Sequence, residues 1–387
     1  MRNKVFVNLS RFLVGFLFIF SGLIKANDPV GFGYKLEEYF EVFHITFLND
    51  YATGIAIILC TLEIVLGGLL LLGFWARKVT LGLLLLIVFF TFLTFYSAFF
   101  KVVTSCGCFG DAIPLTPWQS FSKDLVLLVL IVVLFVNRQR IQPVTTNPSV
   151  PLPALLILTA LAAGFGIYTY NFLPVVDFLP YKTGNHLPSL MRVPPGAPQD
   201  VYEITYTLKH KGSGEQKQMT DKEYLKTEIW KDANWEIIGE PENRLISAGY
   251  QAPIRDLKIT DSQGTDYTSE IIENPYYNLV IVAWNLAEAD RKALGDLNAM
   301  AMNAAENYNI RTVILTATSP EAAESLSGSQ KLAPELFYAD AVPLKSMVRS
   351  NPGLLLLRDG RVVGKWHYHS VPSYDELDRK YFIKNQE

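Results

Sequence analysis

Cysteine is scarce in this sequence and absent from its second half. Of 387 residues, only Cys60, Cys106 and Cys108 are cysteines, which is too few for a disulfide scaffold. Cys60 lies inside an apolar run, as is typical of a buried small hydrophobic residue. Because no cysteine follows Cys108, the remainder of the chain cannot exchange disulfides by itself.

Several other signatures are also missing. The sequence contains no P-loop, glycine-rich dinucleotide turn, paired zinc motif or Ser-His-Asp order. The formal net charge of −3 is nearly balanced and gives no reason to expect nucleic acid as a partner. What distinguishes the chain is therefore the uneven distribution of its apolar residues.

Apolar residues dominate the first part of the chain, up to residue 172, whereas the sequence after residue 195 is typical of a water-exposed protein. Five apolar runs are long enough to span a membrane and lie at residues 6–24, 51–73, 79–100, 121–137 and 152–171. The first run is not interpreted as a signal peptide, because no small-residue cleavage site follows it and Lys25 closes it. The sequence thus predicts a lipid-embedded half and a water-exposed half.

Basic residues predict the orientation of the spans. They occur at the N-terminus (Arg2, Lys4 and Arg11) and in the loops after the second run (Arg77, Lys78) and the fourth run (Arg138, Arg140). The positive-inside rule places all three segments in the cytoplasm. We therefore expect an inner-membrane protein with five spans, a cytoplasmic N-terminus and a periplasmic C-terminal domain.

Polar residues inside the apolar runs form a second signal. Glu63 lies within the second run, where a carboxylate is costly and needs a partner or a cavity. Arg11 and Lys25, at opposite ends of the first run, are its candidate partners, and a structural ion pair and a functional one are equally compatible with the sequence. Gly15 and Gly22, seven residues apart on one helix face, are expected to permit close helix packing, and Gly67-Gly68 to do the same in the second run.

The stretch from Ser105 to Asp111 interrupts the apolar runs and contains Cys106-Gly107-Cys108. A disulfide between these cysteines would close a small ring, which Gly107 makes feasible, and Asp111 is expected to shape the loop. Three interpretations remain open: a redox-active or structural disulfide, a Cu(I) or zinc site that recruits His44, or two inert thiols. If the pair is redox-active, a quinone is the candidate electron acceptor, although no quinone motif is readable.

These motifs resemble those of the DoxX and MauE membrane proteins. The resemblance rests on Arg11-xxx-Gly15, Phe20-Ser21-Gly22-xx-Lys25, Glu63 with Leu66-Gly67, and Cys106-Gly107-Cys108-Phe109-Gly110. The stretch that begins at Asp177 is similar to segments of DoxX-type proteins of Bacteroidetes. The resemblance implies a four-helix bundle over residues 1–140 that is redox-associated or involved in methylamine utilisation. The fifth apolar run lies beyond it, and we expect a fifth transmembrane helix at 141–174.

The second half is expected to begin with an interfacial segment and linker at residues 175–200 and a small β-rich extension at 201–275. The extension should contain a hairpin at 202–208 and 216–220, a short helix capped by Asp221, and a further hairpin near residues 257–260. Strands and helices then alternate over 276–387, with strands expected at 278–284, 311–317, 336–338, 353–357 and 361–366, and with helices at 288–308, from 319, and at 344–348.

The order of elements in 276–387, with Pro352 before the last hairpin, resembles thioredoxin. In thioredoxins this proline is cis and faces the active cysteines. The present sequence has Trp284-Asn285-Leu286-Ala287 where the cysteine pair should follow the first strand, so the resemblance implies a thioredoxin-like domain without its thiols.

Two main hypotheses follow, together with a weaker third. The chain is a redox-associated membrane protein that uses Cys106 and Cys108, possessing a thiol-disulfide or quinone-linked activity. Alternatively, it is a non-enzymatic scaffold whose thioredoxin-like domain binds an envelope protein partner. A carrier in which Arg11 and Glu63 line a polar cavity is the third interpretation.

Overall fold

The computed structural model describes residues 2–102, 107, 109–247 and 249–383. Cys106 and Cys108 lie outside the described residues. Contacts divide the chain into two units, of which the first comprises Met1–Asn185 with Lys258–Glu387 and the second comprises His186–Leu257.

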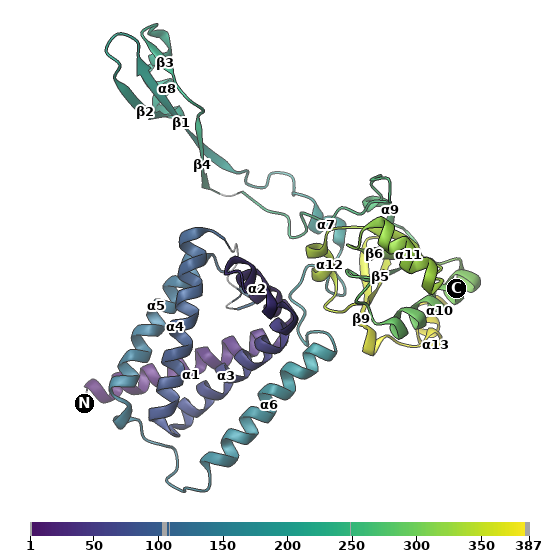
Figure 1. Cartoon of the computed structure of the whole chain (residues 1–387), viewed down its shortest axis with the longest axis horizontal. Helices are drawn as coiled ribbons and strands as arrows, with labels where there is room; N and C mark the ends of the chain where they lie inside the picture. The colour runs from purple at the N-terminus through teal and green to yellow at the C-terminus, as the bar shows by residue number, and fades with distance from the viewer. Residues whose placement is uncertain (1, 103–106, 108, 248, 384–387) are drawn as a thin grey trace. The chain divides into compact units, whose positions relative to one another are not determined.

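Five helices of the first unit are long and apolar enough to cross a membrane, which confirms the five predicted spans (Figure 1). They are α1 (Arg2–Asn27), α3 (Ala52–Leu72), α4 (Ala76–Phe100), α5 (Pro117–Val136) and α6 (Pro151–Asn171). Their shared core contains fully or almost fully buried aliphatic residues, among them Leu70, Leu83, Ile131 and Leu134. The polar backbone of each span is satisfied within its own helix, as a bilayer requires.

Close packing between α1 and α3 depends on two glycines. A Cβ atom on Gly67 would lie 2.8 Å from the carbonyl oxygen of Gly15, and one on Gly15 would lie 3.1 Å from the carbonyl oxygen of Gly67. These separations are too short for a side chain, so the two backbones meet directly. The predicted role of these glycines is confirmed.

A short helix that the sequence analysis missed, α2 (Pro29–Val42), follows α1 and is joined to α3 by η1 (Thr46–Tyr51). Asp28 caps its first turn, Pro29 occupies the first helical position, and Phe32, Leu36 and Tyr39 form its buried face. We call the end of the bundle that carries α2 the α2 end. The opposite end contains the turn between α3 and α4 and the short helix η2 (Arg138–Arg140).

The rest of the first unit is an α/β part with a five-stranded mixed sheet in the order β7-β6-β5-β8-β9. Strands β5 (Tyr277–Val282), β6 (Arg311–Thr316) and β7 (Glu335–Tyr338) are parallel, whereas β8 (Gly353–Arg358) and β9 (Arg361–His367) run antiparallel as a hairpin. The helices are α9 (Thr268–Ile272), α10 (Arg291–Tyr308), α11 (Pro320–Gln330), α12 (Ala341–Met347) and α13 (Tyr374–Leu377). The short segment η4 (Tyr368–Ser370) lies between β9 and α13, and η5 (Asp378–Phe382) follows α13.

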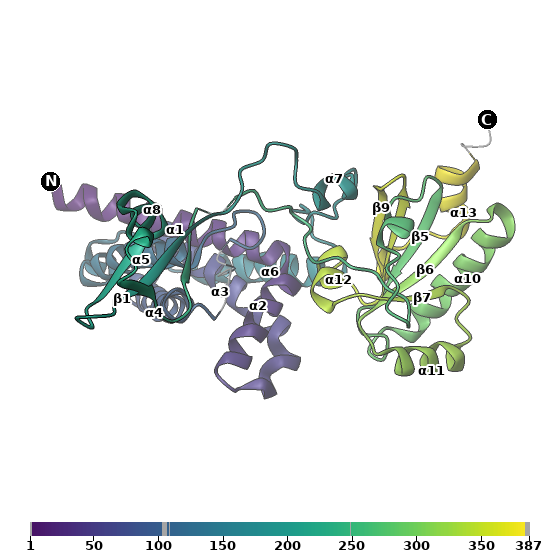
Figure 2. The ribbon, with the colours of Figure 1, turned by 90° about the horizontal axis from the view of Figure 1, so that it is seen from above.

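Both faces of this sheet are covered by other parts of the chain. Its strands are therefore continuous apolar runs in the sequence instead of alternating apolar and polar residues. Leu279 and Ile281 of β5 pack in the same core as Leu294 of α10 and Leu377 of α13. The intervening side chains of β5, Val280 and Val282, are also buried, so they point to the opposite face. Figure 2 shows α10 and α13 close together at the sheet.

The predicted strands and helices of this part are present, although β5 ends at Val282 rather than at residue 284 and α12 spans Ala341–Met347 rather than 344–348. The long helix begins at Arg291 rather than near residue 288, because Asp290 caps it by accepting a hydrogen bond from the backbone nitrogen of Ala293. The hairpin expected near residues 257–260 is wrong. Thr260 instead forms isolated bridges to Asp266 and to Tyr338 beside the sheet.

The second unit begins with α7 (Leu187–Met191) and contains a four-stranded antiparallel sheet. Its strands are β1 (Val201–His210), β2 (Gln216–Thr220), β3 (Trp235–Ile237) and β4 (Glu242–Ser247), with α8 (Asp221–Thr227) and η3 (Ile229–Lys231) between β2 and β3. The predicted hairpin of β1 and β2 is confirmed. The cap of α8 is Thr220 rather than Asp221, because the Thr220 side chain accepts from the backbone nitrogen of Glu223.

Candidate functional site

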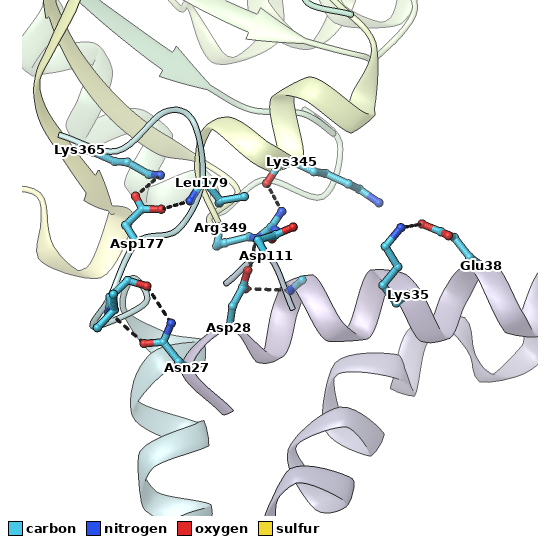
Figure 3. A network of polar contacts seen from close by, with 12 residues as sticks. Asn27, Asp28, Lys35, Glu38, Asp111, Asp177, Leu179, Lys345, Arg349 and Lys365 are labelled. Carbon is cyan, nitrogen blue, oxygen red and sulfur yellow. Dashed lines mark hydrogen bonds and ion pairs between the residues drawn. The ribbon is translucent and has the colours of Figure 1, made fainter. Parts of the chain in front are cut away.

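Arg349 connects the α/β part to the α2 end of the bundle (Figure 3). It follows α12 and is 7% exposed. Its Nε lies 2.9 Å from Asp28 Oδ2 and one terminal nitrogen lies 3.3 Å from Asp111 Oδ2. The other terminal nitrogen donates to the backbone oxygen of Lys345 at 2.6 Å. A planar guanidinium has the donor geometry to serve all three oxygens at once.

Asp28 has two functions in this arrangement. Its Oδ1 accepts a hydrogen bond from the backbone nitrogen of Gly31 at 2.8 Å and thereby caps α2. The same carboxylate binds Arg349. A side chain at Gly31 would collide with both groups, because its Cβ would lie 2.4 Å from Asp28 Oδ2 and 2.7 Å from Arg349. The helix cap of α2 and the ion pair with Arg349 therefore depend on the same carboxylate, that of Asp28.

A second ion pair lies nearby. Lys365 of β9 is 9% exposed and its Nζ lies 2.7 Å from Asp177 Oδ2, in the segment that follows α6. That segment is held to the end of α1, since the Asn27 side chain donates to the Val176 oxygen and accepts from the Val176 nitrogen. We call the contacts of Arg349 and Lys365 with Asp28, Asp111 and Asp177 the junction.

Burial and nearby charges together shift the pKa values of the charged side chains at the junction. Burial raises the pKa of Asp111, and the nearby Arg349 opposes that rise. For Arg349 burial alone would lower the pKa, but the carboxylates of Asp28 and Asp111 outweigh it and the pKa is raised. Burial also lowers the pKa of Lys365 despite its pairing with Asp177. The buried charges of the junction are the cations Arg349 and Lys365, so removing their carboxylate partners Asp28 or Asp177 is costly, whereas the side chain of Asp111 is 53% exposed.

A cleft of about 360 Å³ opens beside the junction. Its lining contains the acidic residues Asp28, Glu37, Glu38, Glu41, Asp111 and Asp177, the basic residues Lys25, Lys35, Lys345 and Arg349, and aromatic residues that include Phe32 and Tyr34. Burial raises the pKa of Tyr34, whose ring lies 4.1 Å from Lys345 Nζ. The cleft has room for a side chain or a short extended peptide.

The loop that contains the two cysteines borders this cleft. Gly107 and Gly110 line it, and both have a positive φ that favours glycine, +65° and +51° respectively. A Cβ on Gly107 would lie 3.3 Å from Lys35 Cγ of α2. The predicted site residues Gly107 and Asp111 are thus brought together with α2 and Arg349, while Cys106 and Cys108 are outside the described residues.

The polar residues predicted inside the bundle separate into two places. Lys25 forms a buried ion pair with Glu63. Arg11 does not reach Glu63, because its guanidinium donates to the backbone oxygens of Leu70, Leu71 and Gln142 at the opposite end. Arg11 therefore satisfies the last carbonyls of α3, and of the two candidate partners the structure selects Lys25.

Pro352 lies directly before β8, and the Asn351–Pro352 peptide bond is cis. Asn351 donates from its side chain to the backbone oxygen of Asn285, which follows β5. Pro352 is therefore three residues from Arg349 in the sequence and belongs to the same edge of the α/β part.

Sequence reasoning missed four polar residues that the structure pairs: Asp28, Asp124, Arg349 and Lys365. Asp124 could have been found by the argument used for Glu63, because it lies within the fourth span, Pro117–Val136. It accepts hydrogen bonds from Lys123 and Thr94 and is fully buried. No sequence pattern around Arg349 or Lys365 distinguishes them from other basic residues, because the second half of the sequence is typical of a water-exposed protein.

The chain is thus a polytopic helical membrane protein with a mixed α/β part joined to one end of its bundle. Residues 3–137 match the sequence model of the family Methylamine utilisation protein MauE, so these residues are a MauE-type membrane domain. This confirms the resemblance inferred from the motifs.

A curated relative gives a second comparison. Protein TlpB from Flavobacterium psychrophilum is 34% identical over 130 residues, which is 32% of this chain and 35% of that protein. The match thus spans about a third of the relative's own length. No solved structure matches the chain.

Proposed function

We propose that the chain is a redox-associated protein of the bacterial inner membrane that exchanges a disulfide between Cys106 and Cys108 and the thiols of a partner protein. The α2 end then faces the periplasm. Support for this orientation comes from the opposite end, where Arg11, Arg77, Lys78, Arg138 and Arg140 cluster near the turns of the bundle. A periplasmic loop can keep a disulfide, because that compartment is oxidising.

The reaction is a balanced exchange. A thiolate of the partner attacks one sulfur of the Cys106–Cys108 disulfide, and the bond between the two loop sulfurs breaks. The partner's second thiolate then attacks the mixed disulfide, so that the partner gains a disulfide and both loop cysteines become thiols. Two electrons move from the partner to the loop.

The observation that carries this proposal is the bond between Arg349 and Asp111. Asp111 is three residues after Cys108, so the α/β part is anchored directly beside the cysteine loop. Because the α/β part has no cysteine of its own, its proposed role is to bind the partner and present it to the loop. Its strand and helix order resembles thioredoxin, a fold that binds thiol partners at the edge where Pro352 lies.

The smaller cavity, within the helices of the bundle, is too small for a quinone. The internal cavity between α1, α2, α3, α4 and α5 has a volume of about 40 Å³, which is room for a few waters and not for a quinone ring. No step of the exchange is therefore assigned to a quinone.

The redox state of the loop tests the proposal. Native membranes are alkylated without prior reduction, and peptides that contain Cys106 and Cys108 are measured by mass spectrometry before and after incubation with a reduced dithiol protein. We expect a disulfide that the dithiol reduces, with the disulfide appearing in the dithiol protein. Cys106→Ser should abolish the transfer at normal protein levels, and Cys60→Ser is the matched control that should leave it unchanged. Free thiols at both positions in native membranes would contradict the proposal.

The alternative is a non-enzymatic scaffold that binds an envelope partner. The absence of cysteine after Cys108 and the extensive ion pairing at the junction favour it. In that case Cys106→Ser has a mild effect, whereas deletion of residues 200–387 abolishes function. Recovery of partners by affinity purification from native membranes, with Cys106→Ser in parallel, separates the two candidates.

A further inference from the structure

The end of the bundle opposite α2 is built from segments that contain basic residues and no acidic ones. It comprises the turn between α3 and α4, the short helix η2 and the segment that follows η2. Asp and Glu are absent from residues 1–27, 64–110 and 125–176, which include all three segments. The carboxylates inside the bundle, Glu63 and Asp124, are already paired with lysines. The basic side chains of this end therefore have no carboxylate in these segments with which to pair.

Four of these basic residues come from two segments that pack together. They lie at the start of α4 and in η2, and we call them the basic patch: Arg77, Lys78, Arg138 and Arg140. The helix η2 packs against α4, and α4 packs along α5 (Figure 1). Val79, next to Lys78, and Ile141, next to Arg140, are buried in the same apolar core. All members of the patch except Arg138 are exposed, so the patch presents its charge to the surface where two neighbouring spans end.

Hydrogen bonds fix the backbone beneath the basic patch. The Arg11 guanidinium donates to the backbone oxygen of Gln142 at 2.9 Å and to two carbonyls at the end of α3, which ties the segment after η2 to that helix. Arg138 donates to the backbone oxygen of Phe135 at 2.7 Å, and its guanidinium lies 4.6 Å from the centre of the Phe135 ring. The cations are therefore presented on an ordered backbone, which lowers the entropic cost of binding a ligand.

Apolar side chains continue from the basic patch along the lipid-facing surface of both spans. The exposed residues of α4 include three at positions i+4, i+8 and i+11 from Arg77, on the same helix face: Leu81, Leu85 and Val88. The exposed residues of α5 include Val129, Val132 and Val136. Trp75, in the turn before α4, is 41% exposed, and aromatic side chains of this kind lie at the headgroup level of a bilayer. A cationic surface next to apolar helix faces has the chemical pattern that an anionic headgroup with acyl chains requires.

We propose that the basic patch binds the headgroup of an anionic phospholipid. The lipid phosphate accepts hydrogen bonds from the arginine side chains, whose planar fork suits phosphate oxygens, and Lys78 adds a point charge. The acyl chains lie along the exposed faces of α4 and α5. Clusters of four or more basic residues next to a span bind anionic lipids in this way, whereas the choline of a zwitterionic lipid cancels the phosphate charge. The proposal goes beyond the thiol exchange and stands whether or not Cys106 and Cys108 react.

Native mass spectrometry of the purified full-length chain in detergent tests the proposal. Phosphatidylglycerol and phosphatidylcholine with identical acyl chains are titrated separately, and the chain should retain phosphatidylglycerol in preference. Lys78→Gln and Arg140→Gln should each weaken its binding about fivefold, because one cation near an anionic headgroup is lost. Lys78→Arg and Arg140→Lys keep the charge and should retain the binding. Lys101→Gln removes an exposed cation at the other end of α4, and this matched control should bind as the parent chain does.

Equal retention of the two phospholipids would overturn the proposal. An equal loss in Lys101→Gln and Lys78→Gln would do the same, since it would indicate diffuse attraction to any cation at a membrane surface. Glycerol phosphate, which has the phosphate without acyl chains, should not displace phosphatidylglycerol at equal concentration; displacement would assign the patch to a soluble phosphate ligand instead. Added salt should weaken binding more steeply in the parent chain than in the double variant Lys78→Gln with Arg140→Gln, and equal salt dependence would contradict a role for these charges.

Discussion

Arg349 and Asp28 are 321 positions apart in the sequence, yet Arg349 Nε lies 2.9 Å from the carboxylate of Asp28. The aspartate caps the helix that covers the α2 end of the bundle, and the arginine directly precedes the segment that leads into β8. The ion pair therefore couples the start of a membrane-associated helix to the edge of the α/β part. It also brings Asp111, beside the cysteine loop, into the same contact.

Replacing Arg349 by methionine should separate the α/β part from the bundle. The substitution leaves the partly exposed Asp28 without its cation, so the cost stays below the roughly 3–5 kcal/mol of breaking a fully buried pair. We expect faster proteolysis in the segment after α6 and loss of a crosslink between cysteines introduced at Lys345 and Glu37, whose charged groups lie 3.7 Å apart. Both are measured on the purified full-length chain.

The matched control is Lys292→Met, which removes an exposed ion pair with Asp296 on α10. Exposed pairs of this kind contribute little, so proteolysis and crosslinking should remain as in the parent chain. Arg349→Lys should give an intermediate result, because an ammonium group keeps the charge but lacks the planar fork that reaches Asp28, Asp111 and the Lys345 oxygen. An unchanged crosslink in Arg349→Met would show that the ion pair does not hold the junction.

The sequence predicts those features that depend on local pattern or on the bilayer. Five spans follow from hydropathy alone, because lipid requires every span to be apolar and internally hydrogen-bonded. The pairing of Glu63 with Lys25 follows from the cost of a lone charge in lipid, which leaves only a few candidate partners. The α2 helix could also have been recognised, since Phe32, Leu36 and Tyr39 recur at helical spacing after a capping Asp28.

The junction could not be predicted from the sequence. Arg349 has partners 321 and 238 positions away, and no periodicity links such distant residues. Lys365 likewise alternates with its neighbours as an ordinary strand residue, and only the folded chain reveals that Asp177 lies 2.7 Å away. Contacts between separately patterned regions are therefore the part of the site that requires the structure.

His367 should make the stability of the chain depend on pH. The residue is 4% exposed, and burial, together with the neighbouring His369, lowers its pKa from 6.5 to about 4. Between these values the unfolded chain binds a proton at this position and the folded chain does not, so stability rises with pH. The contribution is complete above pH 6.5 and is lost as the pH falls towards about 4. His367→Phe should reduce this loss.

Thermal unfolding of the parent chain and His367→Phe across this pH range measures the effect. Other groups titrate in the same range, so the informative quantity is the difference between the two curves. His186→Phe is the control, since His186 is only partly buried and its side chain contacts Ser189. Parallel curves for the parent chain and His367→Phe would contradict the prediction.

Two glycines of α3 should respond oppositely to the same substitution. A Cβ on Gly67 would lie 2.8 Å from the Gly15 carbonyl oxygen and 3.0 Å from Ile19 Cγ1, whereas nothing lies within 4 Å of a Cβ on Gly54. Gly67→Ala must push α1 and α3 apart, and overpacking of this kind costs about 1–3 kcal/mol. Gly54→Ala should instead stabilise the helix by about 0.5–1 kcal/mol, because alanine restricts the unfolded chain without a clash. Thermal unfolding of the detergent-solubilised protein distinguishes the two, and equal shifts for both variants would rule out direct backbone contact between α1 and α3.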